Sequence, residues 1–391
     1  MSEYVIFLII LASGLFFSEI FKRLHLPYVI ALIAAGIFVG PLGLGIVNLT
    51  PSIEFLGSLG AVFLMFMAGL EVKTDVLAKN KKKLIMAALL NGGFPAVIGV
   101  SVTLYFGYDL LASLLIGTIF VSSSIAIIVP SLEEKGLLSS DIGSIIVGTI
   151  MIEDVGSLFI LSILLQTADP TAVLPLPAFV AIVVFSIFGL KAVLPKIETA
   201  FFRWRAREGF EEKLQFIFIT LVAVAVYFEL LGMHAIIAGF LVGLILSESI
   251  QHEHIEKKLH TISYGIFIPL FFIIIGIETD LAAFQKAGNA YLLTIALTGT
   301  LIATKFLSGY LAGYLAGYKR VENALVGFSS IPQLSTSLAV VFTAYELGLI
   351  DSSLQVSIVL ISIITVLISP FVVGSIAKYI KPVEDELELR S

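Results

Sequence analysis

Long apolar runs follow one another along almost the whole chain, separated by short charged clusters or by Pro and Gly. Most runs are near the 20 residues that a helix needs to cross the hydrocarbon core of a bilayer. The pattern therefore predicts an all-α polytopic membrane protein with about 13 transmembrane helices. The predicted spans lie near residues 4–21, 27–46, 53–71, 84–106, 111–132, 142–165, 175–195, 212–231, 233–249, 261–278, 290–318, 324–346 and 353–379.

Composition supports this class and narrows the chemistry. The chain of 391 residues is 58% hydrophobic and 13% charged, with a mean hydropathy of +1.07. It has too few polar residues to cover the surface of a soluble protein. It has no Cys, which excludes disulfides, thiol catalysis and Cys-based metal sites. The spans leave no room for a soluble domain of ordinary size, so the function is expected within the membrane.

Charge placement predicts the orientation. If Lys22 and Arg23 are cytoplasmic, 21 of the 23 basic residues fall on that side, with Lys286 opposite and Lys305 inside a span. This asymmetry predicts a multi-pass protein of the plasma membrane with its N-terminus outside and its C-terminus in the cytoplasm.

The stretch Val147–Leu164, inside the sixth predicted span, has two adjacent acids near its middle, Glu153 and Asp154. A carboxylate at bilayer depth costs several kcal/mol, so two neighbouring ones indicate a function. We interpret them as a cation and proton site.

Two spans are predicted to be interrupted. The fifth has three consecutive serines, Ser122, Ser123 and Ser124, followed by Pro130, and the twelfth has Pro332 followed by polar residues. Pro removes a backbone donor, and hydroxyl side chains can satisfy backbone groups that have left helical geometry. The two spans are offset by seven along the chain, an odd number that inverts their direction in the bilayer. Paired interruptions in inverted halves indicate a transport site at the midplane. The polar residues that we expect to line the second break are Gln333, Ser335 and Thr336.

Lys305 lies near the centre of the eleventh predicted span, at the depth of the acids. A buried Lys needs a partner, so we expect an ion pair with Glu153 or Asp154. Adjacent helix residues point about 100° apart, so one acid can face Lys305 while the other faces the breaks. The competing interpretation is an ion pair that only fixes helix packing, which would leave the second acid unexplained.

Three stretches resemble the monovalent cation:proton antiporters, in the branch that holds the NapA-type sodium/proton antiporters and the membrane domains of Kef-type potassium efflux systems. They are RLHLPYVIALIAAGIFVGPLGLG (Arg23–Gly45), LGAVFLMFMAGLEVK (Leu59–Lys73) and FIPLFFIIIGIETDL (Phe267–Leu281).

The resemblance implies a NapA-like fold of 13 spans with two inverted-topology repeats and two crossed broken helices. It also implies a homodimer formed through a scaffold domain. The expected division is scaffold helices at 1–76 and 201–283, a core transport domain at 80–166 and 289–380, a linker helix at 172–200, and a disordered tail at 381–391.

The resemblance also implies site roles. Asp154 matches the ion-binding aspartate, Ser123 and Ser124 match the small hydroxyl pair of the first broken helix, and Lys305 matches the membrane lysine of NapA-type members. Two positions depart from the pattern. Glu153 stands where electrogenic members have Asp, and the second broken helix lacks the Arg and Glu of a P-R-G-E-type run.

The sequence therefore predicts a secondary transporter, not an enzyme, that exchanges Na⁺, or Li⁺ or K⁺, for H⁺ by alternating access. Oxygens of Asp154, Ser123 and Ser124 are the expected Na⁺ ligands. We expect no cofactor and no nucleic-acid partner, only monovalent cations, protons, lipid and a second copy of the chain.

Three alternatives stay open at this point: Kef-like K⁺ efflux or K⁺/H⁺ antiport, an intramembrane aspartyl protease, and a retinal-type pump built on Lys305. A protease needs its acids on two facing helices with a G-x-G-D motif, which the chain lacks. A retinal pump does not suit thirteen spans with two broken helices.

Overall fold

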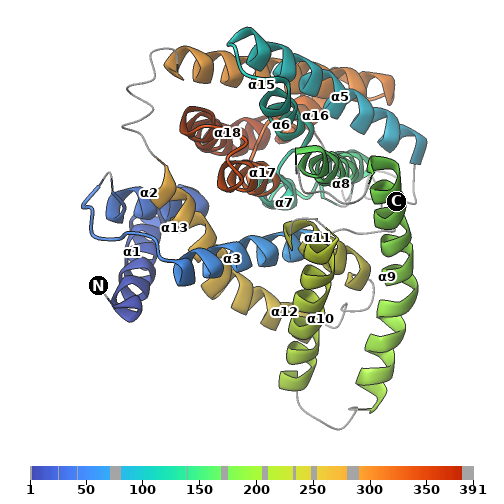
Figure 1. Ribbon diagram of the computed structural model, residues 1–391. Coiled ribbons are helices and arrows are strands. Elements are labelled where there is room, and N and C mark those ends of the chain that lie inside the picture. Colours follow the sequence, from blue (N-terminus) through green and yellow to red (C-terminus); the bar gives the residue numbers. More distant parts are fainter. Residues whose placement is uncertain are drawn as a thin grey trace. The chain divides into compact units, whose positions relative to one another are not determined.

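The computed structural model describes residues 2–380, apart from residues 25, 42, 71–80, 139, 169–174, 205–209, 232–234, 248–252 and 280–289. The predicted tail at 381–391 and Lys286 lie outside the described residues, as do parts of the predicted linker at 172–200. The described part is helical, with no strand (Figure 1). Its helices are α1 (Glu3–Arg23), α2 (Tyr28–Val39), α3 (Pro51–Leu70), α5 (Lys81–Tyr105), α6 (Leu110–Val121), α7 (Ile125–Glu133), α8 (Asp141–Ala168), α9 (Leu176–Trp204), α10 (Phe210–Leu230), α11 (Ala235–Leu246), α12 (Glu253–Ile262), η1 (Ser263–Phe267), α13 (Ile268–Glu278), α15 (Ala290–Leu315), α16 (Arg320–Ser329), α17 (Ser335–Glu346) and α18 (Ser352–Ala377).

Nine helices among the described residues are long and apolar enough to cross a membrane, and α2, α6 and α11 are shorter apolar helices. When α6 and α7, α16 and α17, and the run from α12 to α13 each count once, the described helices form thirteen segments. This number agrees with the spans predicted from hydrophobic runs.

The chain divides into two compact units, Met1–Thr74 with Ser162–Glu278, and Asp75–Leu161 with Thr279–Ser391. In the first unit, α2 packs on α13 and α3 packs on α11 with backbones close together. Small residues allow this approach: a Cβ added to Gly36 would overlap α13 at Ile273, and one added to Gly69 would overlap α11 at Phe240. The assignment of a scaffold role to the first unit and a transport role to the second stays a prediction.

The second unit is built from two similar halves, α5 to α8 and α15 to α18. Each half has a long helix, a short helix, a non-helical break, a second short helix and a long helix. The turns repeat too, because Gly107 before α6 and Gly317 before α16 have φ of 90° and 91°. Positive φ favours Gly, so equivalent turns select the same residue in both halves. In Figure 1, α5 and α15, the first helices of the two halves, lie side by side, and they are in contact.

Both predicted interruptions are present. The first is non-helical backbone at residues 122–124, between α6 and α7, and the second lies at residues 331–334, between α16 and α17. Pro332 is inside the second break, as predicted. Pro130 lies within α7, after the first break, and its role in lining the break stays a prediction. The three serines mark the first break, and Pro130 follows it.

Candidate functional site

The two breaks touch each other inside the second unit. The Ser124 N–H donates to the Pro332 carbonyl at 2.8 Å, and the Gln333 side-chain amide donates to the Ser122 carbonyl at 2.8 Å. The hydroxyls of Ser122 and Ser337 are 3.2 Å apart, and all five residues are buried or lie in the breaks. Each break therefore satisfies backbone groups of the other, which is the condition for leaving helical geometry at membrane depth.

Glu153 lies beside the first break in a closed set of hydrogen bonds. The Lys305 Nζ is 3.1 Å from the Glu153 Oε2, and both side chains are fully buried. Ser123 donates to the same oxygen at 3.0 Å. Asn91 on α5 donates its amide to the other oxygen, Oε1, at 2.6 Å, and Ser308 in turn donates to the Asn91 Oδ1 at 2.9 Å. Both oxygens of the carboxylate thus have strong donors.

Lys305 is equally well satisfied. Its Nζ donates to the carbonyl of Val121 at 2.8 Å and to the hydroxyl of Ser123 at 3.0 Å, besides Glu153. An ammonium has three donors, and three acceptors are present. Val121 is the last residue of α6, so the cation lies at the negative end of a half-helix. Lys305, Glu153 and Ser123 therefore join α15, α8 and the first break into one charged cluster.

Asp154 has a different setting, although it is the next residue along α8. Its side chain is also buried, and the Thr336 hydroxyl donates to its Oδ1 at 3.0 Å. Thr336 is the second residue of α17, so the carboxylate lies at the positive end of the second half-helix. Ser124, at the first break, is buried with no hydrogen-bond partner for its hydroxyl among the described residues.

The structure brings together most of the residues that the sequence predicts for the site, but it divides them. Lys305 pairs with Glu153, which is one of the two pairings that the sequence predicts. Ser123, predicted with Asp154, contacts Glu153 and Lys305 instead. Ser335 is buried at the start of α17. Ser122, Gln333 and Thr336 all lie at the crossing of the breaks.

Sequence reasoning missed Asn91 and Ser308. Asn91 is a lone amide in an apolar stretch, AALLNGGFPA, and that isolation was the available signal. Ser308 carries no such signal, since hydroxyls are common in membrane helices and usually bond to their own backbone. Gly92 completes the arrangement: a Cβ there would come within 3.1 Å of the Val121 side chain, so Gly lets α5 approach α6.

Comparison with known proteins shows the family of this chain. The family model described as the transmembrane sodium/hydrogen exchanger matches residues 6–379. The chain belongs to the sodium/hydrogen exchanger family. This exchanger is 32% identical to a probable Na⁺/H⁺ antiporter of Methanocaldococcus jannaschii over 96% of the chain and 97% of that protein. It is 26% identical to a Na⁺/H⁺ antiporter of Enterococcus hirae over 95% of the chain and 97% of that protein.

A solved structure shows the same fold. The sodium proton antiporter MjNhaP1 of Methanocaldococcus jannaschii at pH 8 is similar to the exchanger with a TM-score of 0.74, over 94% of this chain and 96% of that one, at 14% identity. The predicted family and the NapA-like antiporter fold are thereby confirmed. The exchanger is a multi-pass membrane transporter.

Proposed function

We propose that this exchanger moves Na⁺ in one direction and H⁺ in the other, with Asp154 as the site for which the two ions compete. The observation that carries the proposal is the kind of donor at each acid. Glu153 receives an ammonium and an amide N–H, which can only donate, so a cation could reach this carboxylate only by displacing them. The Ser123 hydroxyl also donates to Glu153, but the same hydroxyl accepts from Lys305. Asp154 receives the hydroxyl of Thr336, which can rotate and offer its oxygen to a cation.

The ligand set that the geometry favours is Asp154, Thr336 and Ser124. Hard cations take oxygen ligands, and freed backbone carbonyls at the breaks add to these. Ser124 contributes a buried hydroxyl that no described residue uses. Ser123 is less suited than the sequence indicates, because its hydroxyl joins Glu153 to Lys305.

We assign a structural role to the ion pair of Glu153 and Lys305. It fixes the place where the two breaks cross, next to the carboxylate of Asp154 that exchanges ions. The pair connects α8 to α15, and Lys305 also binds the last carbonyl of α6. Alternating access would then move the second unit, carrying both acids together, relative to the first unit. We also propose that the exchanger is a homodimer in the plasma membrane with its N-terminus outside.

Sodium is favoured over potassium as the transported ion. The relatives named above are Na⁺/H⁺ antiporters, and the chain is also 26% identical to a protein named Na⁺/H⁺-K⁺ antiporter of Bacillus cereus. Kef-like K⁺ efflux finds no support in these relatives. Transport of K⁺ beside Na⁺ is therefore the second candidate, and a protease or retinal pump is not.

The test is sodium-dependent proton movement in proteoliposomes, followed with a pH-sensitive dye. We expect Asp154→Asn to lose it entirely, because an amide cannot exchange a proton for a cation. Wild-type movement in that variant would overturn the assignment of Asp154.

A matched pair on α17 tests the ligand set. Thr336→Val removes the hydroxyl at Asp154, and we expect the KM for Na⁺ to rise about tenfold, equivalent to one lost polar contact of ~1.4 kcal/mol. Thr343→Val makes the same change at another buried Thr of this helix, whose hydroxyl has no partner among the described residues. We expect that control to keep the wild-type KM. Equal KM values in the two variants would remove Thr336 from the site.

A further inference from the structure

A cavity of about 570 Å³ lies at one end of the second unit, away from the two breaks. It is lined by the last turns of α15, the following loop and the first turns of α16. By the proposed orientation this is the cytoplasmic end, and the inference depends on the proposed function only through that orientation. The lining residues are Tyr310, Leu311, Tyr314, Tyr318, Lys319, Arg320 and Asn323.

Two cations of this cavity have no counter-ion. Lys319 and Arg320 are both exposed, and neither forms an ion pair within the described part of the chain. A third cation, Lys83 on α5, lies nearby, with its Nζ 5.9 Å from the centre of the Tyr318 ring and 3.1 Å from the Ala316 carbonyl.

Two acids at this end are hydrogen-bonded to residues that line the cavity. The Tyr318 hydroxyl donates to the Asp141 Oδ2 at 2.6 Å, and the Lys319 backbone N–H donates to the Glu322 Oε2 at 2.7 Å. Three cations thus face two hydrogen-bonded carboxylates, which leaves a net positive pocket. An anion is the ligand that this charge balance favours.

The apolar part of the cavity indicates that the anion carries hydrocarbon. Leu311 and Tyr314 are exposed by 44% and 65%, on a helix long and apolar enough to span a membrane. The hydroxyls of Tyr310 and Tyr314 have no hydrogen-bond partner among the described residues, and Tyr is a common residue at the level of lipid headgroups. Arg with Lys and phenol hydroxyls is a suitable donor set for a phosphate.

We propose that this cavity binds the headgroup of an anionic phospholipid. Its phosphate lies between Lys319 and Arg320, and its acyl chains lie along Leu311 and Tyr314. Basic pockets at the cytoplasmic ends of membrane helices bind anionic headgroups in this way.

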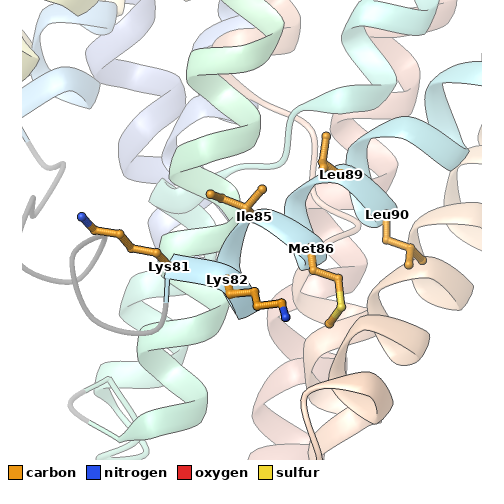
Figure 2. A pocket seen from close by; sticks show the side chains of 6 residues that line it. All are labelled: Lys81, Lys82, Ile85, Met86, Leu89 and Leu90. Carbon is orange, nitrogen blue, oxygen red and sulfur yellow. The ribbon is translucent and has the colours of Figure 1, made fainter.

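A second basic groove on the same unit is a weaker candidate. It has a volume of about 760 Å³ and also begins with two lysines, Lys81 and Lys82, followed by apolar residues. Figure 2 shows that all six lining side chains leave one helix, α5. A single helix face gives a phosphate fewer directions of contact than the cavity formed by α15, its loop and α16.

The test uses purified, delipidated protein in a zwitterionic detergent and follows the thermal midpoint. We expect dihexanoyl phosphatidylglycerol to raise the midpoint, while dihexanoyl phosphatidylcholine and inorganic phosphate do not. The double variant Lys319→Gln/Arg320→Gln should bind phosphatidylglycerol roughly 25-fold more weakly, since each cation contributes about fivefold.

The matched control is Lys22→Gln/Arg23→Gln, an exposed basic pair at the end of α1. It removes the same charge and should keep wild-type affinity. Equal loss in both double variants, or equal stabilisation by inorganic phosphate or phosphatidylcholine, would overturn the proposal. If the first double variant does not fold, Lys319→Gln alone is measured, with a fivefold loss expected. Transport is not the readout, so this test is independent of the assignment of Asp154.

Discussion

Glu153 and Asp154 are neighbours on one helix, yet they lie in opposite chemical settings. Glu153 meets a charged amine and an amide beside the end of α6, whereas Asp154 meets a hydroxyl at the start of α17. The ammonium and the amide N–H at Glu153 cannot become cation ligands, whereas the Thr336 hydroxyl at Asp154 can. The Ser123 hydroxyl at Glu153 is shared with Lys305. Adjacent carboxylates in a membrane helix can therefore have different roles: one fixes the architecture, and the other exchanges ions.

The largest expected effect comes from breaking the Glu153 side of this comparison. Lys305→Met leaves a carboxylate buried without its counter-ion, so we expect the free energy of unfolding to fall by about 3–5 kcal/mol. Lys305→Met combined with Glu153→Gln removes both charges and should return to within about 1 kcal/mol of wild type. Chemical unfolding in detergent micelles measures both. A double variant as unstable as the single one would show that the charges are not coupled.

A smaller effect sharpens the comparison at Asn91. Asn91→Ala removes the donor to the Glu153 Oε1 and should cost about 1–3 kcal/mol of unfolding free energy, because a buried carboxylate oxygen loses its partner. The KM for Na⁺ should stay unchanged, the reverse of the result expected for Thr336→Val. Measurements of the unfolding free energy and of the KM for Na⁺ on the same variants test this prediction.

The control for Asn91 is Ser101→Ala on the same helix. Ser101 is exposed, and among the described residues its hydroxyl bonds only to its own helix, at the Val97 carbonyl, so its loss should change neither quantity. A shift in the KM for Na⁺ in Asn91→Ala without any loss of stability would place Asn91 in the ion path instead.

Much of this architecture could be predicted because apolar length and intramembrane charge are strong signals. Hydrophobic runs predicted the spans, and the triple serine predicted the first break. Lys305 was predicted to pair with one of the two acids, but the sequence could not say which. That choice depends on how α8 is rotated about its axis relative to α15, and helix rotation is set by packing that a single sequence does not display.

The distribution of hydroxyls was the part least accessible to prediction. Ser123 and Ser124 are adjacent and identical in type, yet one joins the charged cluster and the other has a hydroxyl with no described partner. The backbone leaves helical geometry at these residues, so the local dihedral angles of the break, which the sequence pattern does not give, decide where each hydroxyl points. Pro130 lies inside α7, after the break, since a proline can lie inside a half-helix as well as at its end.

The smallest expected effect compares the two ends of the second unit. The Tyr318 hydroxyl is 2.6 Å from Asp141, whereas the equivalent Tyr108 hydroxyl is 3.4 Å from Asp351, beyond the usual range for such a bond. Tyr318→Phe should therefore lower the unfolding free energy by about 0.5–1 kcal/mol, and Tyr108→Phe by less.

The pH dependence of this difference follows from the two phenols. Burial, and then Asp351, raise the pKa of Tyr108 to about 12, while burial and the hydrogen bond to Asp141 raise the pKa of Tyr318. A raised pKa in the folded state means that the stabilisation is complete below the unfolded value of about 10 and is lost only as the pH rises through the folded value. The loss in Tyr318→Phe should thus be constant from about pH 6 to about pH 9. Unfolding curves at three pH values in that window check this, and equal losses in the Phe variants of both tyrosines would show that the two ends do not differ.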